Sequence, residues 1–201
     1  MSSISNTSYL EQLSTWPSEG RHILAHYDET SIIVYQAYRT DIAQYAVAHQ
    51  HFGGAFSYTR MSWIKPNFLW MMFRCGWANK PGQEHVLAIR IPRTFFDELL
   101  HQTVISTFDA ARYQSMDTWR AAVKKSDVRV QWDPDHDPSG KPLARRAVQL
   151  GLRGEALRHY GQTEVLGIED ITEFVKDQNH NTKPPFESLL LPKERIYLPK
   201  T

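Results

Sequence analysis

The stretch from residue 58 to residue 84 places cations inside a run of large apolar side chains. It contains three of the six tryptophans and four basic residues, namely Trp63, Trp70, Trp77, Arg60, Lys65, Arg74 and Lys80. A surface loop has no use for so many apolar side chains, and a plain core would exclude the charges. Because buried cations need anionic or hydrogen-bonding partners, this pattern predicts core packing around a cleft that receives an anion.

The chain is long enough to form one self-sufficient domain. Its 201 residues are 41% hydrophobic and 22% charged, which are ordinary values for a soluble globular protein. A formal net charge of +1 provides no global attraction to nucleic acid or to an anionic membrane. A local basic pocket is compatible with this balance, because a neutral total hides local clusters.

The cysteine content and the apolar runs indicate the compartment. A single cysteine, Cys75, excludes an internal disulfide framework and a cysteine-built zinc site. The opening MSSISNTSYLEQ lacks the basic and then apolar pattern of a secretory signal. The longest apolar run, Phe68 to Phe73, is too short to cross a bilayer. These features predict a cytoplasmic protein with no membrane partner.

Strands are expected where β-branched and aromatic residues gather, and helices where apolar residues recur at 3.6-residue spacing. The expected strands span residues 31–37, 58–64, 84–91 and 128–132. The expected helices span residues 39–52, 66–75, 92–101, 113–125, 153–160 and 168–177. Short strands interspersed with helices favour a single α+β domain over residues 21–201, with a central, mostly antiparallel sheet flanked by helices.

The two ends of the chain differ from this domain in composition. Residues 1–20 are Ser-rich and predict a flexible arm, or a short helix around residues 9–13. The Pro-rich end, about residues 180–201, predicts an extended strap over the surface. Within the domain, four side chains of the apolar helix are expected to be buried against the 84–91 strand: Phe68, Leu69, Met72 and Phe73.

No metal motif is visible, and we expect no metal. His22 and His26 have the spacing of helical zinc ligands, but their segment is extended in character. His49 and His51 lie at a helix end without a third ligand nearby in sequence. The chain also lacks the glycine patterns of phosphate-binding loops and the nucleophile elbow of hydrolases.

Arg74 is a candidate for contact with an anion, as Arg60 is. It follows Trp70 by four residues and precedes Trp77 by three, so a helix would place its guanidinium between two indoles. Arg60, Trp63 and Lys65 would approach the same place. The alternative for each cation is a side chain that extends out of the core to water, or that pairs with a structural carboxylate.

Glu84 is the candidate catalytic group, with Gln83 beside it as a ligand contact. It begins an apolar strand directly after a loop, where a carboxylate can be partly desolvated and act electrostatically or as a base. The alternative is an ordinary glutamate at a strand end. Farther along, Arg146 and Gln149 lie three residues apart and could project together into a cleft, or could belong to a solvated face.

Six segments together carry a resemblance to a known family. They are Tyr27-Asp28, Ile33–Tyr38 (IVYQAY), Arg60–Trp77 (RMSWIKPNFLWMMFRCGW), Gln83–Ile89 (QEHVLAI), Trp132-Asp133-Pro134 and Ala147–Gly151 (AVQLG). These segments resemble the uncharacterised proteins grouped as domain-of-unknown-function family 4291. The resemblance covers about residues 20–155, and the string RMSWIKPNFLWMM is very specific. Membership implies no reaction, because none is known for the family.

A second resemblance, to ADP-ribosyltransferases, is short. Those enzymes place a catalytic Glu at the start of a strand, and the segment from Gln83 to Leu87 looks similar. They also hold NAD with an Arg or His on an early strand, which Arg21 resembles here. This likeness implies NAD as a cofactor and Glu84 as the catalytic residue. The position two before Glu84 is Gly82, where the family pattern has Glu or Gln, so a protein acceptor is not implied.

Three functions compete. The first is a transferase that binds a nucleotide-like anionic ligand and acts on nucleic acid or a small molecule. In it Tyr35, Gln36 and Tyr38 would form a wall for a ring, arginines would contact phosphate, and Glu84 would polarise a ribose hydroxyl. The second is a noncatalytic module in which indoles stack on nucleic-acid bases. The third is a structural or interaction protein whose Trp-rich segment is only core. Exposure separates them: an enzyme needs the charges in one concave pocket, and base stacking needs indoles along an open groove. The sequence indicates no oligomeric state.

Overall fold

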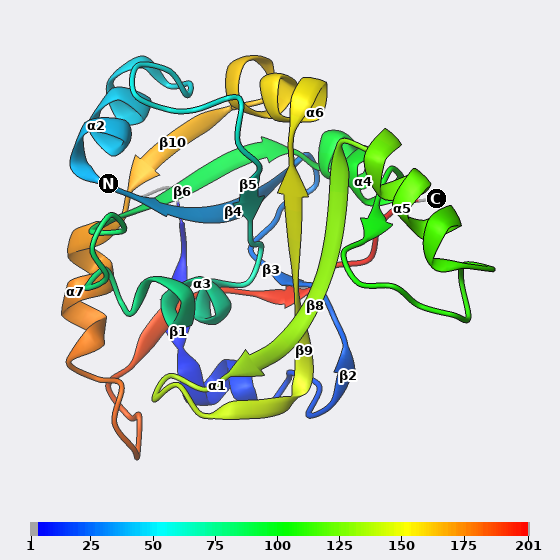
Figure 1. Ribbon diagram of the computed structural model, residues 1–201. Coiled ribbons are helices and arrows are strands. Elements are labelled where there is room, and N and C mark those ends of the chain that lie inside the picture. The colour runs from blue at the N-terminus through cyan, green and yellow to red at the C-terminus, as the bar shows by residue number, and fades with distance from the viewer. Residues whose placement is uncertain (1–3, 201) are drawn as a thin grey trace.

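The computed structural model describes residues 4–200, and its elements follow one another as helices and short strands (Figure 1). The helices are α1 Tyr9–Leu13, α2 Thr40–His49, α3 Phe68–Cys75, α4 Arg93–His101, α5 Met116–Lys125, α6 Gly154–Arg158 with the π-helical turn η1 His159–Thr163, and α7 Thr172–Asn179. The strands are β1 Asn6–Ser8, β2 Gly20–Arg21, β3 Leu24–Ala25, β4 Ser31–Tyr38, β5 Ser62–Ile64, β6 His85–Pro92, β7 Val104–Ile105, β8 Val128–His136, β9 Pro142–Leu152, β10 Gly167–Asp170, β11 Leu190–Pro192 and β12 Arg195–Ile196. The expected single α+β domain is confirmed.

The larger strands form two sheets where one central sheet was expected. In the first, β10, β6 and β4 pair antiparallel in that order. In the second, the order is β2-β9-β8-β7, and β5 pairs with β9. The expected 128–132 strand therefore lies in a different sheet from β4 and β6. It extends to His136 and forms a hairpin with β9, which supplies its partner locally. Parallel pairing is confined, within residues 4–200, to β2 with β9 and β7 with β8.

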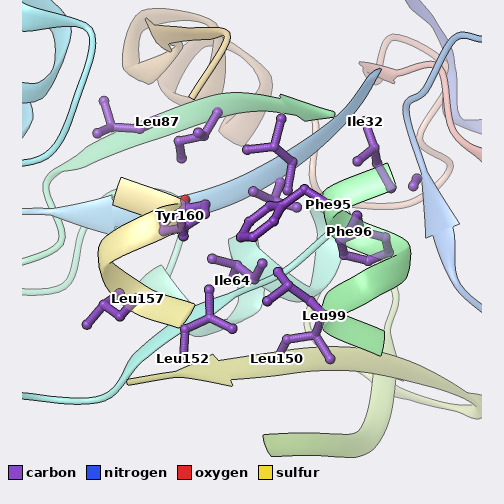
Figure 2. Packing of buried hydrophobic residues seen from close by; sticks show 14 of the residues in the cluster. Ile32, Ile64, Leu87, Phe95, Phe96, Leu99, Leu150, Leu152, Leu157 and Tyr160 are labelled. Carbon is purple, nitrogen blue, oxygen red and sulfur yellow. The ribbon is translucent and has the colours of Figure 1, made fainter. Parts of the chain in front are cut away.

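One hydrophobic cluster joins the two sheets (Figure 2). Alternate residues of each strand point into it, such as Ile32 and Leu87 from the first sheet and Leu150 and Leu152 from the second. Phe96 of α4 fills the space between them and is fully buried. Each sheet thereby covers the apolar face of the other, which explains why the strands divide into two layers rather than one sheet.

A second cluster covers the other face of β4 and β6, where α3 packs. Phe68, Leu69 and Met72 are buried there as expected, opposite Val86. Phe73 is not: it is 37% exposed and stacks on the ring of His136 from the hairpin, with centroids 3.5 Å apart. A helix covering one side of a sheet must expose its far stripe, and Phe73 lies on that stripe.

Local signals set the ends of α3. The Asn67 side chain accepts a hydrogen bond from the Trp70 N–H at 2.7 Å, so Asn67 caps the helix and Phe68 begins it, two residues after the expected Pro66. Gly76 ends the helix with φ of 58°, a left-handed conformation that glycine adopts without a steric penalty. Neighbouring expectations were less accurate. Residues 58–60 form a turn and a bend before β5, and the expected 168–177 helix divides into β10 and α7.

The described part of the expected arm, residues 4–20, packs against the domain. β1 pairs antiparallel with β11 of the strap, and the Tyr9 and Trp16 side chains are buried. These large apolar groups offset the polarity of the serines around them, which is why the segment is not a free arm. The expected strap runs through turns as far as residue 189 and is extended from Leu190, with β11 paired to β1 and β12 to β3. No helix within residues 4–200 combines the length and apolar character that a membrane crossing requires.

Candidate functional site

A cavity of about 380 Å³ lies where the end of β4 meets β5 and α3. Its wall brings together seven of the predicted ligand-binding residues: Gln36, Tyr38, Arg60, Trp63, Lys65, Arg74 and Gln83. They come from β4, from β5 and its flanks, from the last turn of α3, and from the loop before β6. The volume is in the range of small-molecule sites.

The position of Trp63 depends on a glycine in the neighbouring strand. Trp63 of β5 pairs with Gly151 of β9, and a Cβ atom at residue 151 would lie 2.9 Å from the indole. Only a residue without a side chain lets the ring lie this close to β9. Trp63 remains partly exposed, whereas Trp70 and Trp77 are buried at 4% and 9% exposure.

The three cations of the cavity have no carboxylate partner within residues 4–200 at ion-pair distance. Arg60 and Arg74 are exposed at the rim, and Lys65 is buried in the wall at 5% exposure. The Lys65 amine has one weak contact, with the Trp63 carbonyl oxygen at 3.5 Å. Burial, and then the charge of Arg74, lower the pKa of Lys65 to about 8. The cavity therefore carries positive charge that the protein itself leaves unneutralised.

A buried amide organises the hydroxyl groups on the same wall. Gln36 is 3% exposed; its Nε2 donates to the Trp63 carbonyl at 3.2 Å and to Ser62 Oγ at 2.8 Å. Its Oε1 accepts from the Tyr160 hydroxyl at 2.7 Å. Since a carbonyl oxygen only accepts, the amide orientation is fixed. Tyr38 and Ser62 lie 3.0 Å apart, and their mutual hydrogen bond uses one of their two protons. The other is left to donate to a ligand.

Ser62 and Tyr160 were not predicted from the sequence. Ser62 lies within the conspicuous tryptophan-rich stretch, where its small polar side chain gives no signal. Tyr160 is distant in sequence, on η1, and its hydroxyl meets Gln36 only in the folded chain. Tyr35, which was predicted to contact ligand, is fully buried in the cluster beneath α3, because β4 alternates and places Gln36 and Tyr35 on opposite faces.

Glu84 does not line the cavity; its neighbour Gln83 does. The Glu84 carboxylate accepts a hydrogen bond from the Gly82 N–H at 2.7 Å, and this contact lowers its pKa. Within residues 4–200 no lysine or arginine lies at ion-pair distance from Glu84. A lowered pKa keeps Glu84 ionised, and its geometry is that of a loop-stabilising residue at a strand end.

The predicted residues Arg21, Arg146 and Gln149 lie away from the cavity wall. The Arg21 guanidinium lies 6.0 Å from the Trp132 ring centroid and borders a separate cavity. Arg146 is exposed beside Arg21 in the pairing of β2 with β9. Gln149 donates to Asp133 at 2.8 Å. Arg146 and Gln149 do not project together, since residues three apart on a strand face opposite sides.

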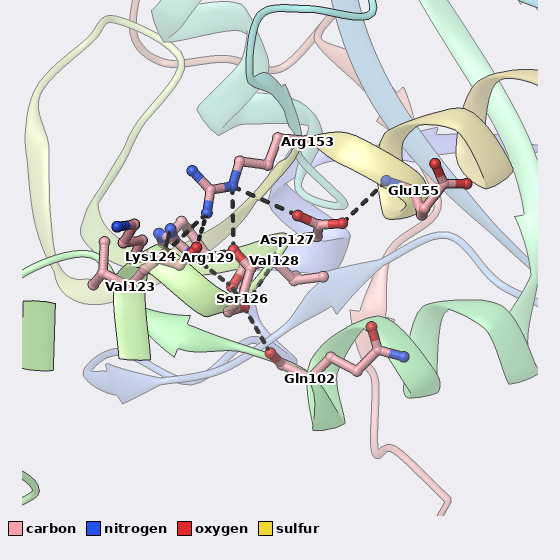
Figure 3. Close-up of polar contacts among 9 residues, drawn as sticks. All are labelled: Gln102, Val123, Lys124, Ser126, Asp127, Val128, Arg129, Arg153 and Glu155. Atoms are coloured by element: carbon pink, nitrogen blue, oxygen red, sulfur yellow. Dashed lines mark hydrogen bonds and ion pairs between the residues drawn. The ribbon is translucent and has the colours of Figure 1, made fainter. Parts of the chain in front are cut away.

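A second group of arginines has a structural explanation (Figure 3). Arg129 and Arg153 donate to the carbonyl oxygens that end α5: both reach Val123, and Arg153 also reaches Lys124 at 2.6 Å. Cations at the C-terminal end of a helix satisfy unpaired carbonyls and favour the helix dipole. Asp127 lies 3.6 Å from Arg153 as well, so this cluster is paired, unlike the cavity cations. No cluster of three or more potential metal-binding side chains occurs within residues 4–200.

The fold and the cavity define an α+β protein with an unneutralised cationic pocket. Residues 22–197 match the model of the domain of unknown function DUF4291, and the chain belongs to that family. A search of curated proteins finds no match.

Proposed function

We propose that the cavity binds the phosphates of a nucleotide-like ligand, NAD among the candidates, and that the protein is a transferase acting on nucleic acid or on a small molecule. One observation carries the proposal: Arg60, Lys65 and Arg74 surround one cavity and have no carboxylate partner in the described chain. A buried cation is normally paired, and Lys65, at 5% exposure, is not, whereas Arg153 beside α5 has Asp127 at 3.6 Å. Guanidinium groups bind phosphate through paired hydrogen bonds, which suits the two arginines at the rim.

The remaining groups of the wall suit the rest of a nucleotide. The partly exposed Trp63 ring offers a surface on which a base can stack. The spare proton of the Tyr38–Ser62 pair and the Gln83 amide can hydrogen-bond to sugar or phosphate oxygens. Glu84 has no place in this proposal, because it lies outside the cavity wall. The ADP-ribosyl transfer chemistry that Glu84 suggested thereby loses its catalytic residue, and NAD is retained only as a ligand.

The alternative of a noncatalytic nucleic-acid module has less support. It needs several indoles along an open groove, and Trp70 and Trp77 are buried. Trp63 is partly exposed at a cavity whose cations lie close together. This arrangement favours one nucleotide-sized ligand over an extended nucleic-acid strand. We also propose a cytoplasmic location, because the one cysteine, Cys75, is free and buried, which suits a reducing compartment.

A thermal-shift screen tests the proposal, because a ligand that binds only the folded state raises its melting temperature. Nucleoside triphosphates, NAD and ADP-ribose would be compared with the corresponding nucleosides. We expect the phosphorylated compounds to raise the melting temperature and the nucleosides to do little. Arg74→Gln should weaken binding by about 10- to 100-fold, since a hydrogen bond to a charged group contributes about 1.5–3 kcal/mol.

Arg120→Gln is the matched control. It removes the same charge from α5, where the Arg120 side chain is 68% exposed and forms an ion pair with Asp117 of the same helix. It should leave the shifts unchanged. Equal weakening by both variants would mean that the effect comes from total charge, and the absence of a shift with every phosphorylated compound would refute the proposal.

A further inference from the structure

Lys65 is held rigidly at the wall of the cavity. Its backbone exchanges two hydrogen bonds with Tyr35: the Tyr35 N–H donates to the Lys65 carbonyl at 2.7 Å, and the Lys65 N–H donates to the Tyr35 carbonyl at 3.3 Å. Pro66 and the capped start of α3 follow directly. The residue thereby links the two sheets, and its side chain, at 5% exposure, borders the cavity. Such a side chain cannot swing freely into water as a surface lysine does.

The amine is poorly satisfied where it lies. An ammonium group has three protons to donate, and the structure supplies one acceptor, the Trp63 carbonyl at 3.5 Å. The carboxylate of Asp133 acts on the Lys65 amine electrostatically and raises its pKa slightly. Both of its oxygens already accept hydrogen bonds, from the side-chain amides of Gln131 at 2.7 Å and Gln149 at 2.8 Å. A buried ammonium with so few partners is costly, so the site favours the neutral amine more than water does. A neutral amine has a free electron pair.

Arg60 and Arg74 can hold a phosphate group beside the neutral amine of Lys65. Arginine stays charged at every physiological pH, so Arg60 and Arg74 can hold phosphate while Lys65 is neutral. With the pKa of Lys65 at about 8, about a tenth of the amines are neutral at pH 7, against less than a thousandth for an ordinary lysine. Desolvated lysines beside other cations are the activated amines of covalent catalysis.

We infer that Lys65 is a nucleophile that accepts a nucleotidyl group from a nucleoside triphosphate held by Arg60 and Arg74, and this inference rests on the proposed function. The amine nitrogen attacks the α-phosphorus, and an N–P bond forms. The bond from the α-phosphorus to the bridging oxygen breaks, and pyrophosphate leaves with that electron pair. The proton lost from nitrogen passes to water at the open side of the cavity. The product is a nucleotidyl-lysine, a phosphoramidate from which the nucleotidyl group can be transferred.

Intact-mass analysis tests this inference directly. The full-length protein would be incubated with each nucleoside triphosphate in a buffer containing Mg²⁺ and analysed at neutral or alkaline pH, because phosphoramidates hydrolyse in acid. We expect a mass increase of one nucleoside monophosphate with at least one triphosphate, approaching one group per chain. Tandem mass spectrometry should place it on Lys65, and added pyrophosphate should reverse it.

Lys65→Arg is the decisive variant, since it keeps the positive charge but removes the nucleophilic amine. It should retain a thermal shift with the triphosphate and carry no adduct. Lys80→Arg, which alters an exposed lysine outside the cavity wall, should still form the adduct. An adduct on any residue other than Lys65, or triphosphate binding without any adduct, would overturn the inference and leave the proposed function intact. If NAD or ADP-ribose bound and no triphosphate did, the inference alone would fail, and if no phosphorylated compound bound, the proposed function itself would fail. Peptide mapping of the unaltered chain decides the matter even if Lys65→Arg does not fold.

Discussion

The Glu194 carboxylate accepts a hydrogen bond from the backbone N–H of Phe68 at 2.7 Å, so the C-terminal strap caps the helix that carries Arg74. The Asn67 amide donates to the other oxygen of Glu194 at 3.1 Å. Within residues 4–200 no cation lies at ion-pair distance from Glu194, which is 4% exposed. The position of α3, and with it one wall of the cavity, therefore depends on a buried carboxyl group from the C-terminal part of the chain.

Burial should make this contact depend on pH. It raises the pKa of Glu194 well above the ordinary value of 4.5. A group whose pKa is higher in the folded state stabilises the fold below its unfolded pKa, and that stabilisation is lost as pH rises through the folded pKa. Glu194→Gln, which cannot ionise, should therefore reduce the fall in unfolding free energy as pH rises above about 4.5. Denaturant titrations at a series of pH values measure this, and identical pH slopes for the two proteins would contradict it.

Lys65 should have the opposite dependence. Its pKa falls from 10.5 to about 8 in the folded state, so the fold is most stable when the amine is neutral, above pH 10.5. That contribution is lost as pH falls through about 8, and it amounts to at most about 3 kcal/mol. Relative to Lys65→Met, the unaltered protein should gain stability between pH 8 and 10.5. A constant difference in unfolding free energy across that window would show that the amine is not desolvated.

The two phenylalanines of α3 should differ strongly when truncated. Phe68 is 1% exposed, and Phe68→Ala should lower the unfolding free energy by about 3–5 kcal/mol. Phe73 is 37% exposed and loses mainly its stacking on His136, so Phe73→Ala should cost about 1 kcal/mol. Urea denaturation of the two variants and of the unaltered protein measures these losses in unfolding free energy. Equal losses would mean that α3 is rotated from the orientation described.

Gly151→Ala tests whether the Trp63 ring needs a glycine at residue 151 in order to lie against β9. The added methyl group would lie 2.8 Å from Met61 Sδ and 2.9 Å from the Trp63 ring, so both must move, at a cost of about 1–3 kcal/mol. We expect lower stability, altered tryptophan fluorescence and weaker ligand binding. Gly167→Ala is the control, because its methyl group would meet its nearest neighbour, Gln50, at 3.9 Å. If both variants behaved alike, the close approach of Trp63 to β9 would be disproved.

Local features were predictable from the sequence, and pairings distant along the chain were not. The apolar run and Gly76 gave α3 nearly its true bounds, because both signals act within a few residues. The cavity residues from Arg60 to Arg74 were found because they crowd one short segment. The division into two sheets was missed, since the hairpin of β8 and β9 is set by register and by the shared core. Tyr160 was missed for the same reason.

Where the sequence predicted two adjacent residues as site residues, the structure places only one of each pair at the cavity. Gln83 lines the cavity while Glu84 does not, and Gln36 lines it while Tyr35 is buried behind it. Strand alternation makes neighbours point apart, and a strand's inward face depends on what packs there. Composition alone could locate the cationic segment, but only the fold could decide which of two adjacent residues lines the cavity.

The binding of inorganic pyrophosphate tests the central claim most directly, because this probe has neither a base nor a sugar. Calorimetric titration would compare the unaltered protein, an Arg60→Gln/Arg74→Gln double variant, and an Arg112→Gln/Arg120→Gln double variant that removes the same charge from exposed sites. We predict that pyrophosphate binds the unaltered protein and the second variant equally, and binds the first at least 100-fold more weakly. Undiminished affinity in the Arg60→Gln/Arg74→Gln variant would contradict the assignment of this cavity as a phosphate site.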